Sequence, residues 1–342
     1  MNRFTSVGSV VILGLGEIGQ EISVDEGTWL PTPTSFSYQW YRNGVQIENA
    51  TERSYLITTD DYETTLSVKV TAVLANYYSE SVNFTSEIAI SGLIGELFTP
   101  NFLISDRDFY NGQSMNPSEI QGLLNSKMSF CEIGNGLASR EPGAPYGNTV
   151  IADNCLAGFS QQTQDMSAVE GICSSYQGSN NESAASIIFK VGLACGISQK
   201  ILLALIEKEQ GLVTDPWPTQ RQFDQATGFS CIENGQLCQI VSSGFFNQIW
   251  AAAKQLKKYG SAPFTWLPIG TQHSIAFSPN QACGSVAVTI ANKATAALYY
   301  YSPYVPNSAA LANLYGVGDS CSSYGIRNFW RTYSDWFGLP RS

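Results

Sequence analysis

Apolar residues follow two different periods along the chain, and the first of them has a repeat of two. They recur at every second position in residues 36–40 and 66–70, and a further strand is expected over residues 79–90. This alternation is typical of β-strands that bury one face. Asn43 and Gly44, which follow the first of these stretches, favour a tight hairpin turn. The pattern predicts a small all-β sandwich at the start of the chain.

From about residue 98 the apolar residues follow the helical period instead. Asn116, Pro117 and Glu119 supply a cap, a first-turn proline and an acid in the order typical of a helix start. Apolar runs predict further helices over residues 183–194, 201–210, 245–259 and 288–301. We therefore expect a β-sandwich over residues 1–92, a linker over residues 93–97 and a mainly α-helical domain over residues 98–342.

The segment ILLALIEKEQGL, residues 201–212, carries two glutamates on different sides of one predicted helix. Six of its first seven residues are apolar, which favours a buried helix, with Ser198 as its cap and Gly211 as its stop. At about 100° per residue, Glu209 falls on the apolar face and Glu207 on the opposite, solvated side. A carboxyl group held against apolar side chains has its ionised form disfavoured and can keep a proton to donate. Glu209 is therefore a candidate general acid.

Composition and charge narrow the function classes. Only 13% of the residues are charged while 12% are aromatic, a profile typical of exported, carbohydrate-handling proteins. The formal net charge of −10 gives no basic footprint for a nucleic-acid partner. No run of about 18 apolar residues predicts a membrane span. The short apolar run near Arg3 lacks a small-residue cleavage site, so we expect either a leader that was removed or another export route, as for a phage virion protein.

The cysteines predict disulfides. All eight lie in the second predicted domain: Cys131, Cys155, Cys173, Cys195, Cys231, Cys238, Cys283 and Cys321. An even number in one domain favours disulfides made in an oxidising compartment, and pairing of neighbours in order is our hypothesis among many connectivities. Zinc is the rival interpretation, but there is no C-x₂-C spacing and the only histidine, His273, lies far from any cysteine pair. We expect an extracellular or wall-associated protein without a metal.

A nucleotide cofactor is also not expected. Gly14, Gly16 and Gly19 form a G-x-G-x-x-G motif after an apolar run, which in another context binds a dinucleotide. That motif must open a helix, but Gly27 and Pro31 follow too soon, and no acid lies about 20 residues further on. We therefore expect no cofactor of any kind.

Three segments resemble the lysozyme-like and lytic transglycosylase superfamily. ALIEKEQGL is similar to its A-L-I-x-x-E-S-G helix, with Glu209 in the place of the one indispensable acid and Gln210 in place of Ser. GFFNQI, residues 244–249, resembles its G-L-M-Q-I box with one extra residue, which implies that Gln248 lines a sugar groove. Residues 292–307 resemble the Ala- and Tyr-rich helix that closes this groove.

Longer stretches resemble two kinds of exported module. KEQGLVTDPWPTQRQFDQATGFSC and RNFWRTYSDWFG, among other segments, resemble a hemagglutinin-like domain of secreted actinobacterial cell-wall proteins or their phages, over roughly residues 98–338. GTWLPTPTSFSYQWYRNG and LITTDDYETTLSVKVTA, with Trp40 on a central strand, resemble bacterial immunoglobulin-like (Ig-like) domains. The resemblances imply an N-terminal Ig-like sandwich, with a protein or wall partner of its own, and a C-terminal lysozyme-like domain with disulfides.

The resemblance implies a glycosidase that acts on peptidoglycan glycan strands. Glu209 would protonate the glycosidic oxygen between N-acetylmuramic acid and N-acetylglucosamine. A second acid would come from Asp215, Asp224 or Glu233, none of which a motif marks. Sugar contacts are expected from an aromatic and polar set, since sugar rings stack on aromatic planes: Thr227, Phe246, Asn247, Gln248, Tyr301 and Tyr304.

Two alternatives stay open beside this hydrolase. If no second acid faces Glu209, the acetamido or 6-hydroxyl group of the substrate would complete the reaction, as in a lytic transglycosylase. A protein that keeps the fold without catalysis would be a wall-binding or adhesion protein, or part of a phage tail tip. Its signature would be a Glu209 that faces solvent or lacks any cleft.

Overall fold

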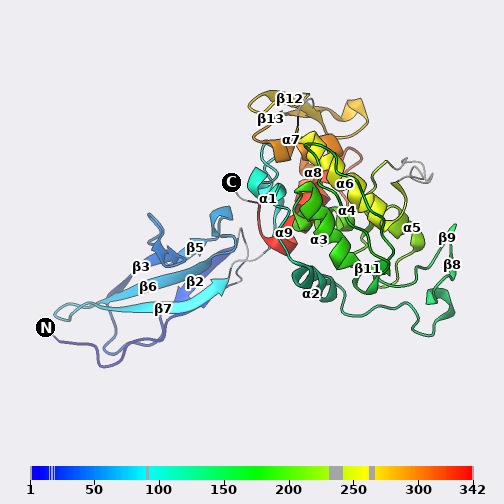
Figure 1. Ribbon diagram of the computed structural model, residues 1–342. Coiled ribbons are helices and arrows are strands. Elements are labelled where there is room, and N and C mark those ends of the chain that lie inside the picture. The colour runs from blue at the N-terminus through cyan, green and yellow to red at the C-terminus, as the bar shows by residue number, and fades with distance from the viewer. Residues whose placement is uncertain are drawn as a thin grey trace. The chain divides into compact units, whose positions relative to one another are not determined.

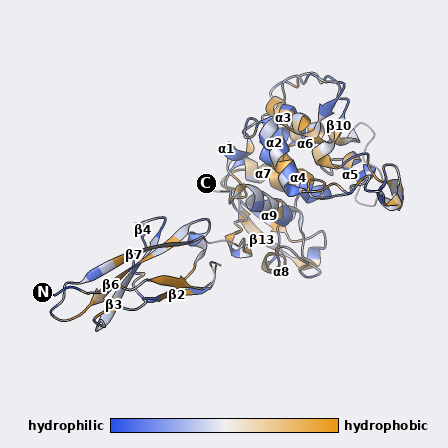
Figure 2. Ribbon diagram, turned by 90° about the horizontal axis from the view of Figure 1, so that it is seen from below, coloured by the Kyte–Doolittle hydropathy of each residue, from blue (hydrophilic) through white to orange (hydrophobic). Residues whose placement is uncertain are grey.

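The computed structural model describes residues 2–14, 16, 18, 20–89, 92–230, 242–261 and 266–340. The chain divides into two compact units, Met1–Leu97 and Phe98–Ser342. Strands make up the first unit and helices dominate the second (Figure 1). Figure 2 shows apolar segments on the strands of the first unit and on the helices of the second. No described helix is both long enough and apolar enough to cross a membrane.

The first unit consists of two antiparallel sheets (Figure 1). One has the strand order β1-β2-β5, with bounds Val11–Leu13, Glu21–Asp25 and Ser54–Leu56. The other has the order β4-β3-β6-β7, with bounds Val45–Gln46, Ser35–Arg42, Thr65–Val73 and Glu80–Ala89. A short 3-10 helix, Thr59–Asp61, lies between β5 and β6, and another, Gly95–Leu97, ends the unit.

The alternating residues of both sheets share one core. Ile22 and Val24 from the first sheet and Trp40, Leu66 and Val68 from the second are buried in the same cluster. The predicted turn joins β3 to β4 through Asn43 and Gly44, both with positive φ. These strands lie where the alternation predicted them, while the likeness to an Ig-like domain stays a prediction.

The second unit is built around nine described helices (Figure 1). Their bounds are α1 Asp106–Phe109, α2 Pro117–Lys127, α3 Ala184–Cys195, α4 Gln199–Gln210, α5 Gln220–Asp224, α6 Phe245–Tyr259, α7 Lys293–Tyr301, α8 Ser308–Ala312 and α9 Gly325–Phe337. Three short two-stranded antiparallel sheets accompany them in the described part of the chain: β8 Pro145–Tyr146 with β9 Thr149–Val150, β10 Ser160–Gln161 with β11 Glu182–Ser183, and β12 Gln272–Ala276 with β13 Ser285–Thr289. Short 3-10 helices span Ala138–Arg140, Leu156–Gly158 and Gln281–Cys283.

Helix α4 lies in the core of this unit. Its residues 201–206 are all buried, and it packs against α3 and α9. The helix begins after Ser198 and ends at Gly211, whose φ of 63° is left-handed and therefore suits a glycine. These two boundaries confirm the sequence prediction. The lysozyme-like likeness of the whole unit stays a prediction.

One predicted helix begins too early. Residues 288–301 were expected to be helical throughout, but Val288 lies in β13, where it pairs with His273 of β12. Val286 and Val288 lie at alternate positions of β13, and such β-branched residues favour a strand. Asn292 then caps α7 by accepting a hydrogen bond from the backbone amide of Thr295.

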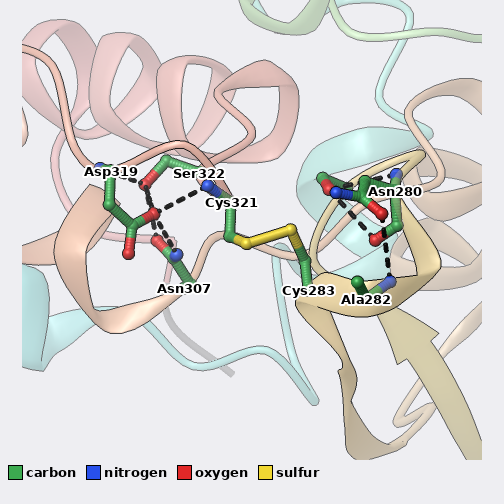
Figure 3. Close-up of a disulfide and its surroundings, with 8 residues drawn as sticks. Asn280, Ala282, Cys283, Asn307, Asp319, Cys321 and Ser322 are labelled. Carbon is green, nitrogen blue, oxygen red and sulfur yellow. Dashed lines mark hydrogen bonds between the residues drawn. A yellow bond between two sulfur atoms is a disulfide. The ribbon is translucent and has the colours of Figure 1, made fainter.

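Three disulfides join described cysteines in the predicted order. They link Cys131 to Cys155, Cys173 to Cys195, and Cys283 to Cys321. The first two connect the loop-rich stretch before α3 to itself and to α3, and the third connects the β12–β13 hairpin to the loop before α9 (Figure 3). The pairing hypothesis is confirmed for these three, whereas Cys231 and Cys238 lie outside the described residues.

Candidate functional site

The last turn of α4 presents three charged side chains in a row. The buried run of residues 201–206 gives way to Glu207, Lys208 and Glu209, which are each partly exposed. The helix stops two residues later, because the left-handed Gly211 turns the chain and donates its amide to the carbonyl of Glu207. The helix end therefore places two acids and a base at the boundary between core and solvent.

The prediction that Glu207 is solvated is wrong. The chain folds back after Gly211 and covers this side of the helix. The Glu207 carboxylate accepts hydrogen bonds from the amides of Val213 (3.1 Å) and Thr214 (3.2 Å) and from the Thr214 hydroxyl (2.7 Å). Burial raises the pKa of Glu207, against the lowering effect of these hydrogen bonds. Glu207 therefore stabilises the turn that ends the helix.

The predicted apolar surroundings of Glu209 are also wrong, since its nearest polar neighbour is a cation. The Lys208 ammonium lies 2.5 Å from Glu209 Oε1 and 2.9 Å from Ser302 Oγ, at the end of α7. The side chain of Lys208 is 9% exposed and that of Glu209 is 23% exposed. Glu209 is thus partly exposed, and its carboxylate contacts the ammonium of Lys208, whose side chain is largely covered.

A turn from another part of the chain lies against Glu209. Gly228 has a φ of 65°, and a Cβ atom at this position would lie 3.0 Å from Glu209 Oε2. Glycine therefore lets the backbone come close to the carboxylate, as at many sites where backbone approaches a functional group. The approach brings residues 225–229 to the end of α4.

Helices α6 and α7 hold this turn in place. The carboxamide oxygen of Gln248 accepts hydrogen bonds from the amides of Thr227 (3.2 Å) and Phe229 (3.1 Å) and from the Thr227 hydroxyl (3.0 Å). The Gln248 nitrogen donates to the carbonyls of Phe229 (3.0 Å) and Ser242 (2.7 Å). The Tyr301 hydroxyl donates to the carbonyl of Thr227 at 2.8 Å. Three segments that the sequence analysis singled out, in α4, α6 and α7, therefore meet at one turn.

These contacts change the roles expected of three residues. Gln248 and Thr227 are fully buried, so they position the turn and do not face a sugar groove. The Tyr301 hydroxyl is engaged with the backbone, and burial, together with the charge of Glu209, raises the pKa of Tyr301 well above its usual value. Tyr304, which follows α7, is partly exposed.

Two neighbouring pockets lie beyond this turn. One, of about 290 Å³, is lined by residues 161–164 together with Phe246 and Asn247. The other, of about 230 Å³, is lined by Gln164, Met166, Phe229, Ser230, Ser242, Asn247, Trp250, Ala251 and Lys254. Gln164 and Asn247 line both pockets, and Phe229 directly follows the glycine that touches Glu209. Glu209 itself lines neither of these two pockets, whereas Asn247 and Phe246 of the predicted sugar-contact set do.

The predicted second acids have structural partners. Asp215 accepts hydrogen bonds from the amide of Trp217 (3.0 Å) and from Gln222 Nε2 (2.8 Å), which use both of its oxygens. Asp224 accepts from Gln220 Nε2 at 3.1 Å on its own helix. Glu233 lies outside the described residues. Asp215 therefore serves the loop after α4.

Sequence reasoning missed Lys208 and a second Glu–Lys pair. Glu182, just before α3, accepts hydrogen bonds from Thr163, Tyr176 and Ser186 and from Lys190, which lies 2.6 Å away. This cluster lies behind the first pocket, since Thr163 lines that pocket. The signal that could have revealed it is Lys190, the one charged residue in the apolar run of α3.

Comparison with known proteins gives one family match. The family described as LasA, N-terminal domain, matches residues 102–342, which is more than two thirds of the chain. No curated protein and no solved structure matches the chain. The match and the disulfides are consistent with a secreted protein that acts on the cell wall, the coarser part of the sequence prediction. The chain belongs to the family of LasA N-terminal domains.

Proposed function

We propose that the second unit cleaves the glycan strands of peptidoglycan, with Glu209 as its general acid. The observation that carries this proposal is the meeting of α4, α6 and α7 at the turn 225–229, with Gly228 against the Glu209 carboxylate. A single partly exposed carboxylate held against a rigid turn can be aimed at a bound substrate. The membership of a family linked to the cell wall supports the same substrate.

The chemistry assigned to Glu209 is proton donation to the leaving group. Its proton passes to the glycosidic oxygen as the bond to the anomeric carbon breaks, and the electron pair of that bond stays on the oxygen. Glu209 then becomes a carboxylate in contact with Lys208. Because Asp215 is engaged in the loop, a substrate acetamido or 6-hydroxyl group is a fitting partner for the second step, as in a lytic transglycosylase.

The first pocket fits the neutral, polar groups of an amino sugar. The described residues that line it are three glutamines, Thr163, Asn247 and Phe246, and none of these is charged. Amides can bind hydroxyl and acetamido groups, and aromatic faces stack on sugar rings. Its volume of about 290 Å³ is near the lower end of ligand sites, so we assign it one sugar of a longer strand.

The decisive experiment is mass spectrometry of purified peptidoglycan digested by the full chain, by Glu209→Gln and by Glu207→Gln. We expect soluble fragments from the wild type and from Glu207→Gln. Glu209→Gln should release fewer fragments by a factor of at least about 100. Glu207→Gln is the matched control, since it changes the neighbouring acid on the same helix and a glutamine can still accept from the amides of Val213 and Thr214.

The ends of the fragments identify the reaction. Reducing ends at muramic acid would indicate a muramidase, reducing ends at glucosamine a glucosaminidase, and 1,6-anhydro ends a transglycosylase. A wild type that sediments with peptidoglycan and releases no fragments would overturn the proposal. It would favour the second candidate, a wall-binding protein, which the contact of Glu209 with Lys208 and its place outside both pockets also support.

A further inference from the structure

Helix α6 supplies part of the wall of the second pocket. The helix residues that line it are spaced by three or four positions, so they lie along one side of the helix: Asn247, Trp250, Ala251 and Lys254. The pocket has a volume of about 230 Å³, and Phe229, which directly follows the glycine in contact with Glu209, lines it too. The turn that contacts the proposed acid therefore also lines this pocket.

The second pocket differs from the first in charge and in apolar content. The described residues that line the first are all uncharged, whereas Lys254 is the one charged residue among those that line the second. Met166, Phe229 and Trp250 also give the second pocket apolar side chains. A neutral sugar has no charge for the lysine to bind. The second pocket therefore fits a group that is partly apolar and carries an anion.

No acid in the described part of the chain forms an ion pair with Lys254, which is partly exposed. Asp165 is a neighbour in sequence of two residues that line the pocket, but it does not line the pocket itself and accepts a hydrogen bond from the amide of Gly178 at 2.8 Å. Asn247 donates from Nδ2 to the carbonyl of Ser243 at 2.9 Å, and its oxygen is an acceptor for an N–H group of a ligand. The pocket thus offers a cation and an amide to one ligand.

We propose that the second pocket binds the acidic substituent that muramic acid carries, with Lys254 as the residue that pairs with its carboxylate. This proposal rests on the proposed function, because it assigns a second subsite on the same glycan strand. The substituent is a lactyl ether, which ends in its own carboxylate or, once amidated, in a peptide stem with further carboxylates. In both forms an apolar methyl group lies near an anion, which matches Trp250 and Met166 beside one lysine. The first pocket then takes a neutral amino sugar and the second the acidic substituent of its neighbour.

The test measures binding to the full chain with Glu209→Gln, so that the ligand is not cleaved. Titration calorimetry compares three tetrasaccharides: N-acetylglucosamine alone, the alternating muramic acid strand without peptide, and the same strand with its peptide stems. We expect Lys254→Met to weaken binding of the acidic strands about tenfold or more and to leave binding of the neutral one unchanged. Added salt should weaken binding of the acidic strands only while Lys254 is present. A loss for the peptide-free strand identifies the lactyl carboxylate as the partner, and a loss for the peptide-bearing strand alone identifies the stem.

Two further variants separate the role of Lys254 from a general effect of charge. Lys258→Met removes the same charge one turn further along α6, where the side chain is exposed and lines neither of these pockets, so binding should not change. Lys254→Glu reverses the charge and should weaken binding of the acidic strands more than Lys254→Met does. The helical circular dichroism signal checks that each variant is folded.

The outcomes that would contradict this inference differ from those that would contradict the proposed function. Acidic strands that bind no more weakly to folded Lys254→Met, or equal losses in Lys254→Met and Lys258→Met, would overturn the inference. Binding of no strand at all to the folded chain would overturn it as well. A wild type that releases no fragments, while Lys254 still selects the acidic strands, would overturn the proposed function alone.

Discussion

The second unit contains two contacts between a glutamate and a lysine that differ in what surrounds the carboxylate. Glu182 is enclosed, with a side chain that is 4% exposed, while its partner Lys190 is 30% exposed. In the other pair the order is reversed: Lys208 is 9% exposed and Glu209 is 23% exposed. The first pair buries its acid and the second buries its base.

The more buried carboxylate, that of Glu182, also has more hydrogen-bond donors than that of Glu209. Glu182 receives hydrogen bonds from three hydroxyl groups in addition to Lys190. Burial opposes its ionisation, but the hydrogen bonds from Lys190, Thr163, Tyr176 and Ser186 outweigh it and lower the pKa of Glu182. Glu209 has one donor within the described part of the chain, Lys208. A carboxylate whose oxygens already accept several hydrogen bonds has a structural role. A surface carboxylate with few hydrogen-bond donors can still bind a ligand.

The largest expected effect is on the free energy of unfolding, and it distinguishes Glu182 from Glu209. We expect Glu182→Gln to lower the free energy of unfolding by about 3–5 kcal/mol, because it leaves Lys190 and the hydroxyl donors around a neutral amide. Glu209→Gln, the matched change in the exposed pair, should lower it by less than about 1 kcal/mol, since the amide oxygen still accepts from Lys208. Urea denaturation followed by the helical circular dichroism signal measures both. Equal losses would contradict the distinction between the pairs.

A smaller effect is expected where the turn meets Glu209. Gly228→Ala places a methyl group 3.0 Å from Glu209 Oε2, so the carboxyl group must move. We expect fragment release to fall about tenfold, because a displaced acid donates poorly. The left-handed backbone should also lower stability by about 1–2 kcal/mol.

Gly211→Ala is the control for this change. Gly211 has nearly the same φ, 63° against 65°, but a Cβ there would meet nothing within 4 Å. The two variants should therefore lose similar stability in the urea measurement, while fragment release falls in Gly228→Ala alone. Activity lost equally in both variants would mean that backbone strain, and not the contact with Glu209, is responsible.

The sequence predicted the helix that carries Glu209 better than the surroundings of its side chains. The limits of α4 depend on local signals, an apolar run with Ser198 before it and a left-handed Gly211 after it. The partner of Lys208 on α7, Ser302, lies 94 residues away in the sequence. A helical projection treats side chains as radial, and it does not show that the long chain of Lys208 reaches its neighbour Glu209.

The same limit explains two wrong predictions: the solvated side chain of Glu207 and the groove-facing side chain of Gln248. The covering of Glu207 depends on the turn after Gly211, which a helical projection leaves out. Gln248 was expected to line a sugar groove, but its amide faces the backbone of the turn 227–229. Position along the chain could be predicted from motifs, whereas the direction of a polar side chain depended on partners far away in sequence.

The smallest expected effect is a difference in how two acids respond to pH. The folded pKa of Glu182 is lowered, so its contribution to stability is present above the unfolded value and is lost as pH falls through the folded value. The folded pKa of Glu207 is raised above its ordinary 4.5 by burial, so the folded state holds its proton more tightly and stability falls as pH rises through the window above 4.5. The two glutamates should therefore give opposite slopes.

Urea denaturation between about pH 2 and about pH 7 measures these slopes as differences from the glutamine variants, below about pH 4.5 for Glu182 and above it for Glu207. As pH rises, the unfolding free energy of the wild type minus that of Glu182→Gln should increase, and the wild type minus Glu207→Gln should decrease. Hydrogen bonds from Thr214 and Val213 offset part of the effect of burial on the pKa of Glu207. If the unfolding free energy of the wild type minus that of Glu207→Gln increased with pH, these hydrogen bonds would outweigh burial. Glu207 would then resemble Glu182, whose carboxylate is held ionised by its hydrogen-bond donors.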